Sequence, residues 1–330
     1  MILRRCLLFA FVLIAACGKG DGTGPTVPVQ VAPGASFGQI TDSLQSRGII
    51  DNGTFFRLYA RINGADARVR PGTYGFRKGQ SWKSILDDFR SGRVMTAKLV
   101  VPEGFSVDKI ARRIAEVSKR DSTQILDLLT SDSVAKKHGV PGPTLEGYLY
   151  PATYDFPMGA HPDTVIKRMV SVYKRNWTPA RKARADSLKL SEREVITLAS
   201  IVEKEAKRHE EMPTISSVYH NRLRINYPLQ ADPTVQYALG SHRARLLYRD
   251  IRAAQDNPYN TYVIKGLPPG PIGSPSARAI DAALYPAETK YLYFVARPDG
   301  SHIFTNSLAE HNRAKAQVRA LRAKQDAAPR

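Results

Sequence analysis

The amino-acid sequence predicts an α+β protein with two domains behind an N-terminal targeting segment. Three observations lead to this fold class. The chain has 330 residues, of which 42% are hydrophobic, enough for two buried cores. A short pattern of strand, turn and helix recurs in the first third of the chain. Longer helices of clear periodicity and a β-hairpin signal occupy the remainder.

The first residues are typical of a bacterial lipoprotein signal peptide, predicted here over residues 1–16. Arg4 and Arg5 precede an apolar run that is too short to span a bilayer, and small residues lead up to Cys17. This pattern predicts cleavage before Cys17 and attachment of lipid to its thiol. An uncleaved anchor helix is the alternative. Residues 17–33 are rich in Gly and Pro, which favours a flexible tether between the membrane and the first domain.

The charge balance favours a polyanionic partner. Lys and Arg number 49 against 30 Asp and Glu, which gives a formal net charge of +19. Nucleic acid is disfavoured because the chain is predicted to be exported and carries no nucleic-acid-binding motif. Anionic lipid headgroups and acidic cell-wall polymers remain as candidate partners. One alternative function is therefore that of a basic exported protein that only binds such anionic surfaces. The sequence contains no paired metal ligands, phosphate-binding glycine loop or nucleophile elbow, so neither a metal nor a cofactor is expected.

A Gly-x-Ser-x3-Ile motif occurs three times, in residues 34–44, 79–89 and 104–114. In each copy a turn glycine precedes a serine suited to cap a helix, and apolar residues four apart follow on one helix face. β-prone runs lead into the second and third copies, so the predicted unit is strand, turn and helix. The arrangement resembles LysM-type modules, which bind glycans containing N-acetylglucosamine, and predicts a LysM-like domain over residues 34–120. The alternative is that the motif serves packing alone.

Two segments rich in polar and aromatic side chains are candidates for sugar binding. LEGYLYPATYDF, residues 145–156, includes Tyr148 among several tyrosines, and aromatic rings stack on the apolar faces of sugars. NPYNTYVIKGLPPGPIG, residues 257–273, is a loop in which Asn260 and Tyr262 offer an amide and a hydroxyl to the substituents of a sugar ring. A tyrosine-rich core and simple turn formation are the respective alternatives.

Two glutamates lie at the margins of a predicted helix that begins near Ser191. One apolar stripe of this helix comprises Val195, Leu198, Ala199, Val202 and Ala206. Glu203 and Glu205 fall on opposite edges of the stripe, while Lys204 points away from it. Partial burial disfavours the charged form of a carboxylic acid and raises its pKa, which suits a general acid near neutral pH. The alternative is that both are ordinary boundary residues.

The next predicted helix, over residues 213–225, has Ile215, Val218, Tyr219 and Leu223 on one apolar face, and Arg222 falls within that face. A guanidinium there needs an acidic or carbonyl partner, and a purely structural ion pair is favoured over a role in the site. Gln230 and Asp232 follow in a turn that starts a further short helix. Asp232 is either the N-cap of that helix or a second acidic group near a bound sugar. Residues 291–305 then carry a hairpin signal, two β-prone runs around Arg-Pro-Asp-Gly.

Several segments between Ala199 and Asn312 together resemble the endolytic murein transglycosylase family, described as MltG or YceG-like. They are ASIVEKEA, YHNRLRINYPLQADPTVQYALG, YNTYVIKGLPPGPIGSPS and YLYFVARPDGSHIFTNSLAEHN. The resemblance extends back through LEGYLYPATYDF to the Gly-x-Ser motif at Gly34. It implies a LysM-like domain followed by a lysozyme-like, YceG-like catalytic domain over residues 121–325. It also maps the catalytic glutamate of the family onto Glu205.

The resemblance implies a lyase that cuts peptidoglycan glycan strands internally, between N-acetylmuramic acid and N-acetylglucosamine. The products would carry 1,6-anhydro ends, and the cut would terminate strand elongation. Glu205 would act first as an acid and then as a base, without a cofactor. The candidates to orient the sugar are Tyr148, Gln230, Asp232, Asn260 and Tyr262.

The predicted lipid anchor places the protein in the cell envelope, attached to a membrane and facing the periplasm or extracytoplasmic space. The resemblance adds peptidoglycan as the partner and peptidoglycan synthases as further candidates. Two features depart from the family. Glu205 is followed by Ala206, where related lytic enzymes usually carry a hydroxyl residue, and many members have a transmembrane helix where this chain is predicted to carry a lipid on Cys17. The competing class of function is a non-enzymatic scaffold that binds cell-wall glycan.

Overall fold

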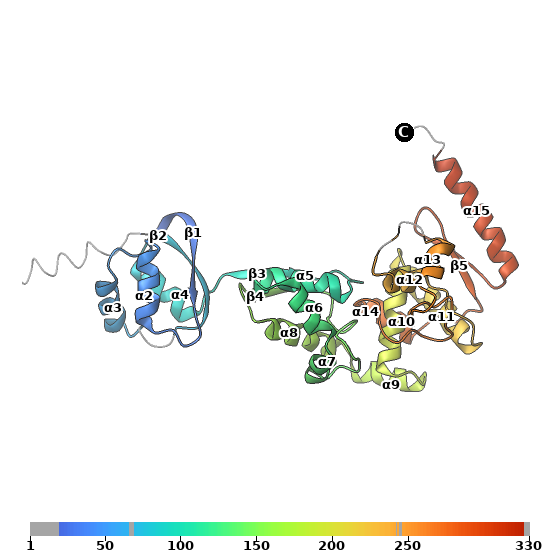
Figure 1. Cartoon of the computed structure of the whole chain (residues 1–330), viewed down its shortest axis with the longest axis horizontal. Coiled ribbons are helices and arrows are strands. Elements are labelled where there is room, and N and C mark those ends of the chain that lie inside the picture. The colour runs from blue at the N-terminus through green and yellow to red at the C-terminus, as the bar shows by residue number, and fades with distance from the viewer. Residues whose placement is uncertain (1–19, 66–68, 242, 244–245, 327–330) are drawn as a thin grey trace, which may run out of the picture. The chain divides into compact units, whose positions relative to one another are not determined.

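The computed structural model describes residues 20–65, 69–241, 243 and 246–326 (Figure 1). It is a mixed α+β structure, as predicted, with short two-stranded sheets and a predominance of helix. The chain divides into two compact units. The first contains the described residues up to Leu99, together with Glu116–Lys119 and Tyr154–His161. The second contains Val100–Ala115, Arg120–Thr153 and the described residues from Pro162 onward.

The first unit is built around an antiparallel pair of strands and three helices. Its elements are β1 (Asp21–Val31), α2 (Phe37–Ser46), α3 (Gly53–Ile62), β2 (Gly72–Gln80) and α4 (Trp82–Ser91). The register of the sheet places Val29 opposite Tyr74. The apolar residues of the first two Gly-x-Ser motifs are buried in its core, namely Ile40, Leu44, Ile85 and Phe89.

The serines of these two motifs cap helices, as predicted. Ser36 accepts a hydrogen bond from the backbone N–H of Gln39 at the start of α2, at 3.2 Å. Ser81 accepts one from the backbone N–H of Ser84 at the start of α4, at 3.3 Å. Each bond satisfies an N–H group that has no partner within its own helix.

The flexible tether predicted over residues 17–33 is wrong for residues 21–31, which form strand β1. Val27, Val29 and Val31 alternate along this segment, and Val29 and Val31 are buried against the core. This period of two defines a half-buried strand, and it outweighed the Gly- and Pro-rich composition on which the prediction of a tether was based.

The third Gly-x-Ser motif belongs to a different unit from the first two. Residues Val100–Ala115 fall in the second unit. The predicted boundary between residues 120 and 121 is therefore wrong, because the second unit already begins at Val100. The motif follows β3 (Thr96–Val100), which pairs with β4 (Thr153–Pro157), and leads into α5 (Val107–Ser118). Its Gly104 is held by backbone bonds to the loop before α14, since Gly104 N–H donates to Ser274 O at 2.7 Å.

The second unit is mainly helical. Its further elements are α6 (Ser122–Thr130), α7 (Asp132–His138), α8 (Pro162–Asn176), α9 (Pro179–Ser187), α10 (Glu192–Glu205), η1 (His209–Glu211), α11 (Met212–Arg224), α12 (Asp232–Ala238), α13 (Tyr248–Ala253), α14 (Ala277–Leu284), β5 (Tyr293–Ala296), β6 (His302–Thr305) and α15 (Leu308–Asp326). Helix α10 lies among α11, α12 and α14 (Figure 1). A capping box of Ser191 and Glu194 starts it, and every residue from Val195 to Val202 is buried.

The predicted hairpin near the C-terminal end is confirmed. Strands β5 and β6 pair antiparallel, with Tyr293 opposite Thr305. The turn between them is closed by Asp299, whose carboxylate accepts bonds from the N–H and hydroxyl of Ser301.

Within the described ranges, no helix is both long enough and apolar enough to cross a membrane. The predicted signal peptide and Cys17, the predicted site of lipid attachment, lie outside the described residues.

Candidate active site

Glu205 is the last residue of α10 and lies half-buried at the end of its apolar stripe. The hydroxyl of Tyr219, on α11, donates a hydrogen bond to Oε1 of Glu205 at 3.0 Å. Burial raises the pKa of Glu205 to about 8, and the negative charge of Asp232 adds to the rise. The bond from Tyr219 and the charge of Arg222 act in the opposite direction. A carboxyl group in these surroundings is protonated at neutral pH and can act as an acid.

Tyr219 keeps its proton and therefore stays a donor. Its side chain is almost fully buried, and burial together with the neighbouring Glu205 raises the pKa of Tyr219 well above its ordinary value. The ring packs edge-on against Phe294 of β5, with centroids 5.9 Å apart. The sequence assigned Tyr219 only to the apolar face of its helix. One signal could have identified this role. A tyrosine in the apolar stripe of one helix can direct its hydroxyl at a candidate acid on the helix that packs against that stripe.

Asp232 and Tyr262 form a second polar pair beside Glu205. The hydroxyl of Tyr262 donates to Oδ1 of Asp232 at 2.5 Å. Asp232 is the first residue of α12 and is exposed, while the N-cap is Ala231. The alternative prediction, that Asp232 is merely the N-cap, is therefore wrong, and its carboxylate is available to a ligand. The charges of both Asp232 and Glu205 raise the pKa of Tyr262, after burial, so this tyrosine also remains a donor.

Gln230 stands where the chain turns from α11 into α12. Its backbone adopts a φ of 48°, a left-handed conformation that is unfavourable for residues other than Gly. The conformation is held by bonds to the loop that carries Tyr262. Gln230 N–H donates to Thr261 O at 2.9 Å, and Ala231 N–H donates to the Thr261 hydroxyl at 2.9 Å. Gln230, Asp232 and Tyr262 are thus brought to one edge of the unit by pairing of two loops.

Asn260 and Tyr148 require a correction. Both side chains are 0% exposed. The Asn260 amide donates to Ile251 O at 2.9 Å and Ala254 O at 3.1 Å, where it satisfies carbonyls at the end of α13. Tyr148 packs edge-on against Tyr173 with centroids 5.2 Å apart. Because neither side chain reaches the surface, we assign both to the framework instead of the predicted sugar contact. Their residue types suit a core and a binding site equally well, so only burial separates the two roles.

Arg222 has a structural role, as predicted, but its hydrogen bonds in the described part of the chain go to backbone carbonyls and not to the acidic partner of the predicted ion pair. Its guanidinium donates to the backbone carbonyls of Leu292, at 2.7 Å, and Leu229, at 2.6 Å. It lies over the rings of Tyr227 and Tyr293, 5.3 and 5.2 Å from their centroids. These contacts hold the hairpin and the segment before α12 against α11, which keeps a positive charge near Glu205.

Glu203 has different surroundings from Glu205. Its carboxylate accepts the backbone N–H of Ser276 at 2.9 Å and the Ser276 hydroxyl at 2.6 Å. Ser276 is the N-cap of α14, so Glu203 is tied to the start of a helix. Between the two, Lys204 donates to Gly104 O at 2.9 Å, and burial lowers its pKa. Both side chains are engaged with the framework, which leaves Glu205 as the candidate acid.

The site contains carboxylic acids, tyrosine hydroxyls and an amide, but no set of ligands suited to a metal. Among the residues that the structure describes, no group of three or more His, Cys, Asp or Glu side chains could hold a metal ion. The arrangement is suited to proton transfer by a single carboxylic acid, next to a carboxylate that can stabilise positive charge.

Comparisons with known proteins agree on one family. The sequence matches the YceG-like family over residues 29–317. It is 34% identical to a Bacillus subtilis protein named endolytic murein transglycosylase, over 96% of this chain and 90% of that protein. A Streptococcus pneumoniae protein of the same name is 29% identical, over 88% of this chain and 58% of its own length. A crystal structure of a yceG-like protein from Listeria monocytogenes has 33% identity and a TM-score of 0.60, covering 88% of this chain and 99% of that one.

Proposed function

This chain belongs to the YceG-like family, and we propose that it is an endolytic peptidoglycan lytic transglycosylase in which Glu205 is the catalytic acid and base. The substrate is the glycan strand of peptidoglycan, consistent with the names of the relatives in Bacillus subtilis and Streptococcus pneumoniae. The observation that carries the assignment of Glu205 is its position at the end of a buried helix, bonded to Tyr219 and beside Asp232.

The reaction needs one carboxyl group. Glu205 donates its proton to the oxygen that joins C1 of N-acetylmuramic acid to N-acetylglucosamine, and the bond from C1 to that oxygen breaks. Positive charge develops at C1 and the ring oxygen, where the Asp232 carboxylate can stabilise it. The Glu205 carboxylate then removes the proton from the C6 hydroxyl of the muramic acid, and that oxygen bonds to C1. The products are a 1,6-anhydro end and a free 4-hydroxyl, and Glu205 regains its proton.

The side chains around Glu205 assist each half of this cycle. Tyr219 stabilises the carboxylate after it has given up its proton, because its hydroxyl donates to Oε1. Tyr262 orients Asp232 through its own hydrogen bond. Tyr262 and Gln230, at the surface of the same loop pair, are the remaining candidates to bind the sugar.

Product analysis tests the reaction. Purified peptidoglycan digested with the protein should yield fragments with anhydro ends, each 18 Da lighter than the hydrolysis product because one molecule of water (roughly 18 Da) is not incorporated. Reducing ends would mean hydrolysis. Retention of glycan without release of fragments would favour the scaffold function.

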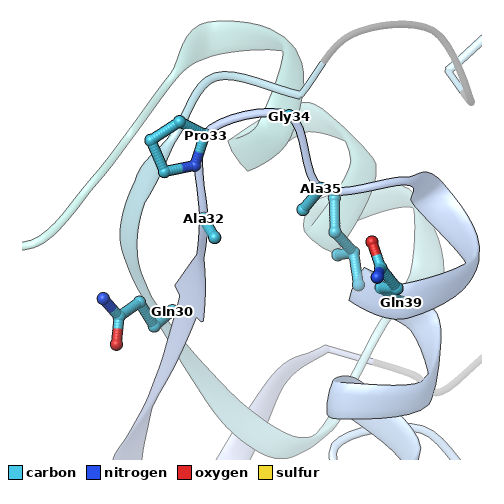
Figure 2. A pocket seen from close by; sticks show the side chains of 7 residues that line it. Gln30, Ala32, Pro33, Gly34, Ala35 and Gln39 are labelled. Atoms are coloured by element: carbon cyan, nitrogen blue, oxygen red, sulfur yellow. The ribbon is translucent and has the colours of Figure 1, made fainter.

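We further propose that the first unit is LysM-like and binds glycan. The support is a cavity of about 340 Å³ at the turn between β1 and α2, whose lining includes Gln30 of β1 and Gly34, Ala35, Gln39 and Ile40 of the first Gly-x-Ser motif (Figure 2). The Gln39 amide oxygen accepts the Ser36 N–H, which leaves its NH2 group as a donor beside the apolar side chains of Ala35 and Ile40, a combination that suits an N-acetyl sugar. Filling the cavity by Ala35→Trp in an inactive Glu205→Gln background should weaken binding of N-acetylglucosamine oligomers in calorimetric titration. The exposed Thr54→Trp is the control, and equal affinity of the two variants would contradict the assignment.

The proposed location is the cell envelope, with the chain anchored by a lipid on Cys17. The support is the sequence pattern of residues 1–17, in which Arg4 and Arg5 precede an apolar run and Cys17 follows two alanines. Cys17→Ser should shift the protein from the membrane fraction to the soluble fraction, whereas Cys6→Ser, within the same leader, should not. Membrane retention of Cys17→Ser would favour the uncleaved anchor helix. Peptidoglycan synthases are the proposed partners at this location.

A further inference from the structure

A second buried carboxylic acid lies in the same unit, at Glu146. It belongs to the LEGYLYPATYDF segment, and it is 3% exposed. Burial raises its pKa to about 7. Burial of a carboxyl group is unfavourable unless its hydrogen bonds are satisfied, yet the Oε1 atom of Glu146 is buried without a partner among the described residues. The proposed mechanism makes no use of this group.

The contacts of Glu146 come from three elements. Its Oε2 atom accepts the backbone N–H of Val107, at the start of α5, and the hydroxyl of Tyr237, on α12, each at 3.1 Å. The charged groups that face it are Asp108 of α5 and Lys204 of α10. Tyr259 completes the surroundings, with its ring 4.9 Å from the ring of Tyr237.

The backbone beside Glu146 is rigidly placed. Gly147 adopts a left-handed φ of 84°, and a Cβ atom there would lie 2.6 Å from Cβ of Pro271 and 3.0 Å from Cγ2 of Ile196 on α10. Only Gly fits, because any other residue would be both strained and in collision with its neighbours. The backbone at Glu146 therefore has a fixed position, and an element that bonds to the Glu146 side chain is positioned by it.

That element is α12, which carries Asp232 at its first residue and Tyr237 near its last. A helix of seven residues is too short to be stable alone, so its position depends on its contacts. Its N-terminal end is tied to Thr261. Its C-terminal end is tied by the Tyr237 bond to Glu146 and by a 3.3 Å bond from the Asn257 amide to Ala238 O. Helix α12 thus links Glu146 to the Asp232 carboxylate beside Glu205.

We propose that Glu146 is a positioning residue, which holds α12 through Tyr237 so that Asp232 faces Glu205. The inference rests on the proposed function, since its effect is read through the acid at position 205. The groups that face Glu205 are Tyr219 and Arg222 of α11, Asp232 of α12 and Tyr262 of the following loop. Of these, Asp232 lies on α12 and Tyr262 bonds to Asp232, so release of the helix should change both the rate and the pH at which Glu205 loses its proton.

The test measures kcat, KM and the alkaline limb of the pH–rate profile for Glu146→Ala, Glu146→Gln and Tyr237→Phe, with soluble glycan strands as the substrate. Glu146→Ala should lower kcat about 30-fold with little change in KM, since misplacement of a catalytic group by about 1 Å can cost about 100-fold. Its alkaline limb should move to lower pH, because Asp232 no longer raises the pKa of Glu205. Glu146→Gln keeps an oxygen acceptor for Val107 and Tyr237 and should restore most of kcat and the original limb.

Tyr237→Phe removes only the hydroxyl. It should lower kcat and move the alkaline limb of the pH–rate profile to lower pH, as Glu146→Ala does, but by a smaller amount. A purely structural role would lower the thermal midpoint of these variants and leave kcat and the limb of the folded fraction unchanged. Should Glu146→Ala fail to fold, Tyr237→Phe decides the question, and an unchanged profile overturns the proposal. Glu288→Ala, an exposed acid with no role in the site, is the matched control. Full activity of Glu205→Gln would instead overturn the proposed function.

Discussion

Replacement of Glu205 by Gln is expected to lower the rate of glycan cleavage by about 10³-fold, because an amide cannot donate the proton that the leaving oxygen needs. The fold should persist. Gln has nearly the shape of Glu, and its amide oxygen can still accept the hydroxyl of Tyr219. Since burial already favours the neutral form of Glu205, a neutral amide adds no desolvation cost. Release of anhydro-ended fragments, followed by mass spectrometry, measures the loss, and the thermal midpoint checks the fold.

Glu203→Gln is the matched control, since it removes the other carboxylate of the same helix. Its amide oxygen can still accept one bond from Ser276, so the expected cost is about 1–2 kcal/mol of stability, with turnover within about tenfold of the parent. Loss of turnover in Glu203→Gln with activity retained in Glu205→Gln would exchange the roles of the two residues.

Asp232→Asn and Tyr219→Phe are expected to move the alkaline limb of the pH–rate profile in opposite directions. Activity requires protonated Glu205, so it should fall as the pH rises through the pKa of that group, about 8 in the parent. Asp232 raises this pKa by repulsion, so Asp232→Asn should shift the limb to lower pH. Tyr219 lowers it by donating to the carboxylate, so Tyr219→Phe should shift the limb to higher pH.

The two variants should also differ in rate. Asp232→Asn removes the negative charge that stabilises the cation developing at C1. It should therefore lower kcat by about 100-fold. Tyr219→Phe keeps the ring packed against Phe294 and should lower kcat by less than about tenfold. Initial rates from about pH 5 to pH 10 provide both quantities. A common direction of shift, or none, would mean that the limb reports a group other than Glu205.

The sequence predicted the local features of this protein well, since each follows from neighbouring residues. The helical period placed Glu203 and Glu205 on the edges of a buried stripe, and the structure places both there, half-buried at the end of α10. The serines at 36 and 81 cap helices, and the Arg-Pro-Asp-Gly turn closes a hairpin. Arg222 has backbone carbonyls as partners, one of the two kinds of partner expected for it. Such features depend on periodicity and capping, which operate over a few residues.

The roles of individual polar residues were harder to predict. Tyr148 and Asn260 have side chains suited to a sugar, yet both are completely buried. Tyr219 was assigned to an apolar face, and its hydroxyl instead meets Glu205. Residues 21–31 had the composition of a tether, and they form a strand because β2, more than 40 residues away in the chain, pairs with them. In each case the deciding contact comes from a distant segment.

Patterns along the chain were enough to identify the family, the α+β class and the helix that carries the two candidate acids. The folded chain was needed to show which of the two glutamates faces Tyr219 and Asp232, and which is tied to Ser276. A side chain's chemistry depends on its burial and on the charges near it, and residues far along the chain supply both. The pKa of Glu205 is raised by the fold around α10, which no periodicity within the helix can specify.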